Sequence, residues 1–242
     1  MDRNELKLKA KQINKESNPS VFTMGLIYFL VTGLLAILIA QLSSSSVSTD
    51  NLEQFMSNYN KYLDAGNVTA AYNYVTKYLP TARSSVLAGV LTILKSVVDA
   101  GFLIFIIKTV RMTGAEFLNI LDGFTYFFKL LLMYILKTIF ITLGYIFLIF
   151  PGVIVTYALR MSVYLLIDHP DWGVFKCLSE SASMMRGHKW ELFCLDLSFL
   201  GWYLLEALCS LVKIYAEPFT KTTYTLFYQQ LAGILDYTQV ET

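Results

Sequence analysis

Long runs of apolar residues constrain this chain more than any other feature of its sequence. The run Val21–Gln41 has no charged side chain, and about 20 such residues are enough for a helix to cross a bilayer. Four more long apolar runs, which carry a few charged residues, are Ser85–Val110, Phe127–Phe150, Val153–Ile167 and Leu192–Ile214. A weaker run, with Thr, Tyr and Gln interleaved, is Phe219–Leu235. The pattern predicts an all-α, polytopic membrane bundle of about six transmembrane helices.

The composition supports a membrane protein and excludes several other classes. Charged residues make up only 15% of the 242 residues and hydrophobic residues 55%, whereas about 25% of an ordinary globular domain is charged. A net charge of +1 excludes the basic footprint of a nucleic-acid binder. The three cysteines have no metal-ligand spacing. We therefore expect the lipid bilayer as a partner, no cofactor and no nucleic acid.

The first apolar run also fits a secretory signal. About 20 residues precede it, however, and no small-x-small cleavage site is evident, which favours an uncleaved span. With six spans, ten basic residues fall on the side of the N-terminus and five on the other. Because basic residues are retained in the cytoplasm, we expect both termini there and the protein in the plasma membrane.

The spans divide the chain into four regions. Residues 1–20 form a basic amphipathic helix that we expect on the inner leaflet, and residues 21–41 form the first span. Residues 42–84 begin with the serine-rich stretch Ser43–Ser46 and then repeat apolar residues at helical spacing on both sides of Gly66. This pattern predicts an extracytoplasmic helical hairpin, which packs on the membrane or docks a partner. Residues 85–242 contain the other five spans and the cytoplasmic surface helices Glu116–Phe124 and Trp172–Met185.

Several of these connecting segments carry recognisable motifs. They are Glu116-Phe-Leu-Asn-Ile-Leu-Asp-Gly-Phe124, Phe150-Pro-Gly-Val-Ile154 and Ser183-Met-Met-Arg-Gly-His-Lys-Trp-Glu-Leu-Phe193. From about residue 85 onward the chain resembles the bacterial multi-pass family called domain of unknown function 975. The resemblance implies an all-helical plasma-membrane protein of a Gram-positive-type bacterium, distantly like the membrane domain attached to some glycerophosphodiester phosphodiesterases. It implies no established activity.

Charged residues inside the apolar runs are the candidate functional residues. Charge within a membrane costs several kcal/mol, so each such residue needs a partner, water or a function. The candidate binding residues are Lys95, Asp99, Lys137, Arg160, Asp196 and Glu206. Their depths predict that Lys95 pairs with Glu206 and that Asp99 pairs with Lys137 or Arg160. Either the pairs are structural and fix the order of the helices, or they line a hydrated path or a pocket for a headgroup or solute.

Catalytic motifs such as a Walker loop or His-Glu-x-x-His are absent from the sequence. The residues Asp168-His169-Pro170-Asp171, with His188 and Glu191, either converge on a metal or cap helices, and the second reading is favoured. We predict a non-enzymatic transport or channel component that acts with a membrane partner or as a homo-oligomer. The alternative is a scaffold or accessory subunit that binds its partner through the outer hairpin. A third and weaker alternative is a lipid-headgroup enzyme that uses His188.

Overall fold

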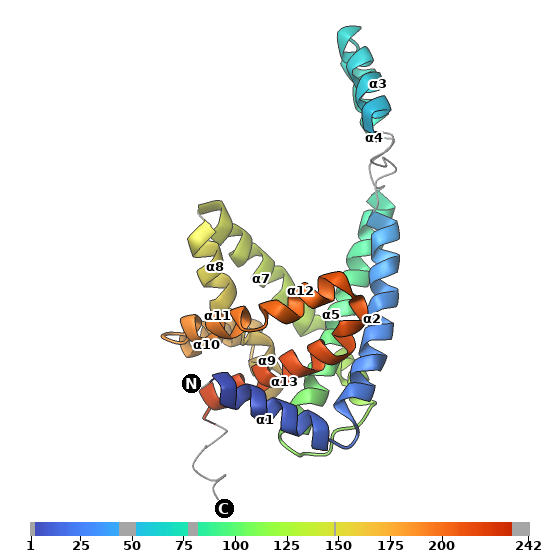
Figure 1. Ribbon diagram of the computed structural model, residues 1–242. Helices are drawn as coiled ribbons and strands as arrows, with labels where there is room; N and C mark the ends of the chain where they lie inside the picture. The colour runs from blue at the N-terminus through green and yellow to red at the C-terminus, as the bar shows by residue number, and fades with distance from the viewer. Residues whose placement is uncertain (1–2, 44–51, 77–81, 148, 234–242) are drawn as a thin grey trace, which may run out of the picture. The chain divides into compact units, whose positions relative to one another are not determined.

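The structure is a computed structural model that describes residues 3–43, 52–76, 82–147 and 149–233, and within these ranges it contains helices and no strand (Figure 1). This confirms the all-helical class. The chain divides into two compact units, one made of residues 1–31 and 96–242 and the other of residues 32–95. The helices are α1 (Arg3–Glu16), α2 (Val21–Ser43), α3 (Leu52–Asp64), α4 (Val68–Thr76), α5 (Ala82–Val110), α6 (Asn119–Asp122), the 3-10 turn η2 (Gly123–Tyr126), α7 (Phe127–Phe147), α8 (Ile149–Ala158), α9 (Ser162–Asp168), α10 (Val174–Met184), α11 (Lys189–Leu197), α12 (Leu200–Leu208), the 3-10 turn η3 (Ser210–Val212) and α13 (Lys213–Leu231).

Four helical segments among the described residues are long and apolar enough to cross a membrane. They are Val21–Leu42, Ser84–Val110, Asn119–Ile146 and Phe150–Asp168. These segments correspond to the first four predicted spans, and the fifth and sixth differ from the prediction.

The predicted fifth span, Leu192–Ile214, is two short helices and a 3-10 turn instead of one long helix. The break follows Leu197, where α11 ends. Lys7 of α1 donates a hydrogen bond of 3.0 Å to the carbonyl oxygen of Ser198, and Arg3 donates one of 3.4 Å to that of Cys194. The carbonyl groups after the end of a helix lack partners within it, so Lys7 stabilises the interruption from the far end of the chain. Arg3 adds a second bond to the carbonyl group of Cys194, which already accepts one from the backbone of Ser198.

The predicted sixth span, Phe219–Leu235, corresponds to α13, which begins at Lys213 and ends at Leu231; residues 234 and 235 lie outside the described residues. Most of α13 is buried within the protein although it is rich in threonine. Thr220 and Thr223 donate hydrogen bonds to the carbonyl oxygens of Ala216 and Phe219, one turn back. The sequence of α13 therefore suits a helix that is covered by protein, not by lipid.

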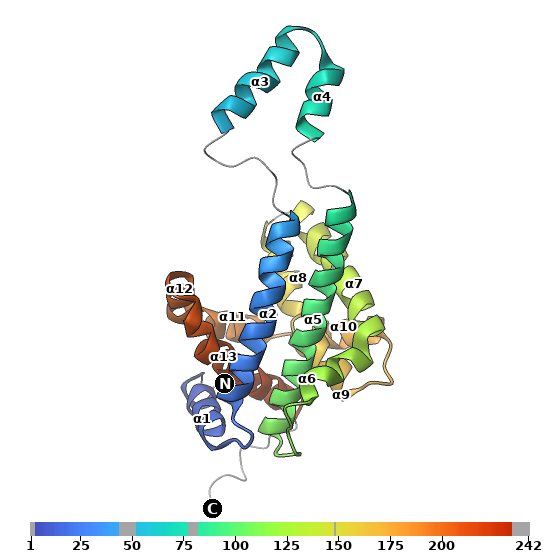
Figure 2. The ribbon, with the colours of Figure 1, turned by 90° about the vertical axis from the view of Figure 1, so that its right-hand side faces the viewer.

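The N-terminal helix α1 covers part of α13. Leu6 and Ala10, the apolar face that we expected on the inner leaflet, are buried. The hydroxyl of Thr222 donates a hydrogen bond of 2.8 Å to the side-chain oxygen of buried Asn14. In both views α1 lies alongside α13, and both run obliquely to α5 (Figures 1 and 2). The apolar face of α1 is thus a protein contact.

The paired helices α7 and α8 meet closely at Gly144 and Gly152. A Cβ atom on Gly144 would lie 3.0 Å from the Cα of Gly152, and one on Gly152 would lie 2.5 Å from the ring of Tyr145. Pro151 and Gly152, which separate the third and fourth predicted spans in the sequence, both belong to the first turn of α8. Proline fits there because the first turn of a helix needs no backbone donor from it.

The expected cytoplasmic surface helices are shorter than the sequence indicates. The stretch Glu116–Phe124 forms α6 and the start of η2, and Trp172–Met185 forms α10. Both α6 and η2 pack against α5 at glycines: a Cβ on Gly101 of α5 would lie 2.0 Å from the carbonyl oxygen of Ile120 in α6, and one on Gly123 of η2 would lie 2.2 Å from that of Val97. No side chain fits between these backbones.

The second unit contains the two amphipathic helices α3 and α4. Gly66 ends the first of them with a positive φ of 69°, which glycine adopts without steric cost. Asn67 then caps α4 by accepting a hydrogen bond of 3.0 Å from the backbone of Ala70. Phe55 stacks on Tyr74 with ring centroids 5.4 Å apart. The serine-rich stretch after Ser43 and residues 77–81 lie outside the described residues.

Candidate functional site

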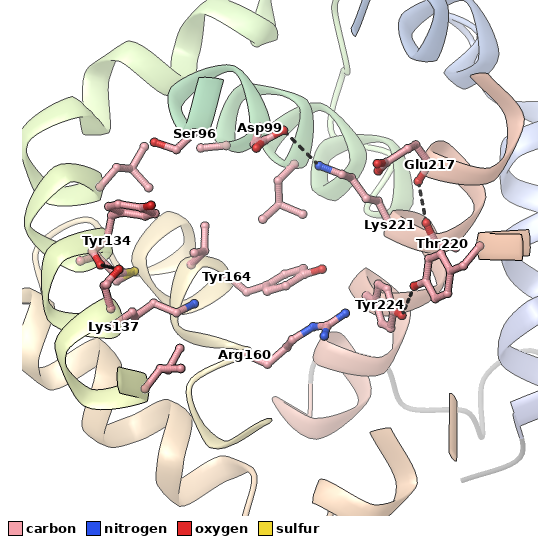
Figure 3. A pocket seen from close by; sticks show the side chains of 18 of the residues that line it. Ser96, Asp99, Tyr134, Lys137, Arg160, Tyr164, Glu217, Thr220, Lys221 and Tyr224 are labelled. Atoms are coloured by element: carbon pink, nitrogen blue, oxygen red, sulfur yellow. Dashed lines mark hydrogen bonds and ion pairs between the residues drawn. The ribbon is translucent and has the colours of Figure 1, made fainter. Parts of the chain in front are cut away.

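A cavity of about 590 Å³ lies within the first unit, between α5, α7, α9, α12 and α13. Six charged side chains line it, three carboxylates and three cations, and Figure 3 shows the cavity from close by. These six are Asp99, Lys137, Arg160, Glu206, Glu217 and Lys221. Four of the six predicted binding residues therefore line one cavity. Of the other two, Asp196 contacts the cavity wall through Arg160, and Lys95 belongs to the second unit.

Arg160 reaches the cavity from the break between α8 and α9. The break is stabilised by two serine hydroxyls, which satisfy the carbonyl groups freed there. Ser181 of α10 donates to the carbonyl oxygen of Ala158, and Ser162 donates to that of Leu159, both at 2.8 Å. An interruption of this kind is tolerated at membrane depth where protein covers the backbone.

Asp196 neutralises Arg160, with 3.3 Å between guanidinium and carboxylate. The hydroxyl of Tyr157 donates a hydrogen bond of 2.9 Å to this carboxylate, and Tyr224 donates another. The guanidinium also lies 4.8 Å from the centroid of the Tyr224 ring. This cluster holds the arginine in one orientation at the cavity wall.

Asp99 forms the second charged cluster. It accepts a hydrogen bond from the hydroxyl of Tyr28 on α2, and the ammonium group of Lys221 lies 3.9 Å from its carboxylate. Lys221 also lies over the rings of Tyr28 and Phe102, at 4.8 and 5.2 Å from their centroids. The predicted pairing of Asp99 with Lys137 or Arg160 is therefore wrong, because α13 supplies the cation.

The contribution of α13 is what the sequence pattern did not reveal. Glu217, Lys221 and Tyr224 follow one another at spacings of four and three residues, so they share one helical face. That spacing is a usable signal. It is obscured because Lys221 also fits among the basic residues outside the membrane.

The residues of the alternative metal cluster are bound elsewhere. Arg111 holds Asp168 through two hydrogen bonds of 2.9 and 2.7 Å, and Tyr228 donates a third of 2.6 Å. His169 stacks on Trp172 with centroids 4.0 Å apart. Among the described residues no group of three or more His, Cys, Asp or Glu side chains is arranged to hold a metal ion.

His188 pairs with Glu191 of the following helix, at 2.9 Å between Nδ1 and the carboxylate. This hydrogen bond lowers the pKa of Glu191 below its usual value, against a smaller opposing effect of burial. At the neighbouring helix end, burial and the charge of Arg3 lower the pKa of Lys7. Glu191 lies in the first turn of α11 and Lys7 binds the carbonyl group of Ser198 just after the last turn. Neither group lines the charged cavity.

Over the described ranges, the fold and the cavity define an all-helical protein with four helical segments long and apolar enough to cross a membrane and with charged side chains gathered around one cavity. Residues 145–234 match the model of the family described as "Protein of unknown function (DUF975)". This match supports the family resemblance over residues 145–234, which include the second and third motifs but not Glu116–Phe124; no likeness to glycerophosphodiester phosphodiesterases is shown. Searches of curated proteins and of solved structures found no similar protein.

Proposed function

We propose that this protein is a non-enzymatic, multi-pass protein of the plasma membrane that acts as a transport or channel component through its charged cavity. The observation that carries the proposal is the gathering of six charged side chains around one cavity. Buried ion pairs can often be replaced by apolar residues without loss of stability. A bundle that only had to be stable would therefore gain little from six such residues, whereas a polar solute requires them.

The topology that we propose has four spans and one segment that enters the membrane and returns. The helix α12 has nine residues, which is about half the length needed to cross a bilayer. Its side chains Leu204 and Leu208 are 61% and 86% exposed, as lipid-facing residues are. Transporters build solute sites from such interrupted helices near the middle of the membrane. Four spans, like six, place both termini on the same side, which the basic residues of α1 assign to the cytoplasm.

Osmotic swelling of proteoliposomes tests this function with a panel of chemically different solutes. Liposomes with the full-length protein are challenged with glycerol, potassium chloride, potassium phosphate and glycine, and solute entry is followed by light scattering. We expect at least one solute to enter faster than into protein-free liposomes. Entry of all four solutes at the rates of protein-free liposomes would contradict the proposal.

Lys137→Gln is the variant that separates a path from a structural element. Within the described residues Lys137 has no ion-pair partner, so its loss leaves the pairs of the bundle intact. We expect solute entry to fall at least tenfold with an unchanged unfolding temperature. Lys11→Gln removes the same charge from the exposed face of α1 and should leave entry unchanged. A folded Lys137→Gln protein with full solute entry would exclude the cavity as the path.

A second candidate function is favoured by the surface of the second unit. Val68 and Tyr72 of α4 are 68% and 67% exposed, and Met56 and Leu63 of α3 are 45% and 41% exposed. As an alternative, we propose that an extracytoplasmic α3–α4 pair binds a membrane partner or a second copy of the chain. Tyr72→Ser with Val68→Ser should then abolish a defined cross-linked complex in intact cells. An unchanged complex would contradict this alternative.

A further inference from the structure

Lys137 and Glu217 lie at opposite sides of the cavity (Figure 3). In Figure 3, Lys137 and Arg160 extend along the lower edge of the view, whereas Asp99, Lys221 and Glu217 lie along the upper edge. Arg160 and Lys221 are each paired with a carboxylate, Asp196 and Asp99 respectively. The charges of these two pairs largely cancel.

Three lining residues remain after these pairs are set aside. Lys137 on α7, Glu206 on α12 and Glu217 on α13 line the cavity, and no ion pair joins any of them to another described residue. A charge in low-dielectric surroundings that has no partner is costly. The three residues therefore offer one cation on one side and two carboxylates contributed by neighbouring helices.

A ligand that satisfies this arrangement carries both signs of charge. An anionic group beside Lys137 would also meet the guanidinium of Arg160, which Asp196 and the Tyr224 ring hold in place. An ammonium group would meet the carboxylates of Glu206 and Glu217. A zwitterion brings no net charge into the membrane, so its transfer costs less than that of either ion alone. A cavity of about 590 Å³ lies in the range of small-molecule sites, roughly 300 to 1,000 Å³.

We propose that the cavity binds a zwitterionic molecule, with its anionic group at Lys137 and Arg160 and its ammonium group at Glu206 and Glu217. The inference rests on the proposed function, in which the cavity is a solute site. The same chemistry belongs to a soluble zwitterion and to the headgroup of a zwitterionic lipid.

Three matched probes test the charge pattern. Glycerophosphoethanolamine carries both charges, glycerol 3-phosphate only the anion, and ethanolamine only the cation. Each is titrated into the full-length protein in detergent by calorimetry. We expect the dissociation constant of the zwitterion to be at least tenfold lower than that of either half. Equal or tighter binding of glycerol 3-phosphate, or no binding of any probe, would overturn the inference.

Two variants assign the two sides of the cavity. Lys137→Gln should weaken the zwitterion and glycerol 3-phosphate at least tenfold. Glu217→Gln should weaken the zwitterion and ethanolamine but leave glycerol 3-phosphate unchanged or tighter. Glu206→Gln provides the same test if the Glu217 variant does not fold. Lys11→Gln and Glu53→Gln remove equal charges from exposed sites and serve as controls. A zwitterion preference that survives both carboxylate variants would overturn the assignment.

Lipid nanodiscs then identify the source of the zwitterion. Displacement of glycerophosphoethanolamine by phosphatidylethanolamine but not by phosphatidylglycerol supports a headgroup, and displacement by neither supports a soluble molecule. Equal displacement by phosphatidylglycerol, which has no ammonium group, would overturn the inference. Zwitterion binding without solute entry into proteoliposomes would refute the transport function alone. Solute entry that depends on Lys137, combined with a preference for the pure anion, would refute the zwitterion alone.

Discussion

Single charged residues in this protein differ in how they are neutralised. Asp196 binds one cation and two tyrosine hydroxyls, and Asp168 binds Arg111 and Tyr228. Lys137, in contrast, has no carboxylate in ion-pair distance among the described residues. The first two carboxylates hold helices together, whereas Lys137 is the residue that we propose contacts the ligand.

Removal of the Asp196 carboxylate is expected to destabilise the protein. Asp196→Ala leaves Arg160 and two tyrosine hydroxyls without their acceptor. Because Arg160 and Asp196 are 35% and 18% exposed, we expect a loss below that of a fully buried pair, about 2 to 3 kcal/mol. Chemical denaturation in detergent measures the loss. The control Asp171→Ala, which removes a carboxylate from an exposed site, should change the free energy of unfolding by less than about 0.5 kcal/mol.

The His188–Glu191 pair should respond to acid. The hydrogen bond from His188 lowers the pKa of Glu191 in the folded protein. The pair therefore contributes stability above the ordinary glutamate pKa, and this contribution is lost as the pH falls through the lowered value. In His188→Ala the pKa of Glu191, measured by NMR titration, should rise toward the ordinary range. An identical pKa in both proteins would contradict this cause. The energy involved is small because both side chains are partly exposed.

At the scale of helices, distant residues decide where elements end. The break between α11 and α12 has no proline, and the sequence there is an apolar run that predicts one continuous span. Cations of α1, about 190 residues away in the chain, bind the carbonyl groups at this break. The local sequence therefore does not predict where α11 ends. The first four spans could be predicted from the local sequence, because the length of each apolar run is sufficient to cross a membrane.

The contact between α1 and α13 predicts a contrast between two leucines of α1. Leu6 is 2% exposed and Leu8 is 68% exposed. Leu6→Ala should cost about 2 to 4 kcal/mol, because it leaves a cavity in a packed contact. Leu8→Ala should change the free energy of unfolding by less than about 0.5 kcal/mol. Denaturation curves of the two variants measure the contrast, and equal small effects would indicate that α1 does not pack on the bundle.

The contact of α6 with α5 makes an equally sharp contrast between two glycines. A methyl group on Gly101 would collide with the backbone of Ile120, whereas Gly201 of α12 has nothing within 4 Å of its Cβ position. Gly101→Ala should therefore lower the unfolding free energy by at least about 1 to 3 kcal/mol. Gly201→Ala should be neutral or stabilise the helix by up to about 1 kcal/mol. Comparable stability of both variants would contradict this close approach.

For the whole molecule, the number of spans determines which residues face the outside. Six spans place the α12–α13 connection outside, and the four-span arrangement with a returning segment keeps it within the membrane. The candidate site was predictable to the extent that its residues lie in long apolar runs: Asp99, Lys137, Arg160 and Glu206 were found in this way. Glu217 and Lys221 were not, because Glu217 precedes the weaker run Phe219–Leu235 and Lys221, near the start of that run, also fits among the basic residues outside the membrane.

Labelling of intact cells with a membrane-impermeant maleimide distinguishes the two topologies. In a protein without its native cysteines, we expect Asn60→Cys on α3 to be labelled from outside. Lys213→Cys should remain unlabelled, as should Glu180→Cys on α10, which the proposed topology assigns to the cytoplasm. Labelling of Lys213→Cys at the rate of Asn60→Cys would restore the six-span arrangement. Permeabilised cells, in which Glu180→Cys reacts, provide the control for reactivity.

The threonines of α13 have a consequence for how this protein can vary among its relatives. Thr220 and Thr223 give their hydroxyl protons to their own helix, so neighbouring helices meet mainly their methyl groups. Selection at these two positions therefore acts on volume and branching, and valine satisfies both requirements. Thr222 is constrained differently, because its hydroxyl also reaches Asn14. We infer that Thr222 and Asn14 change together in evolution, while the other two positions drift freely between threonine and valine.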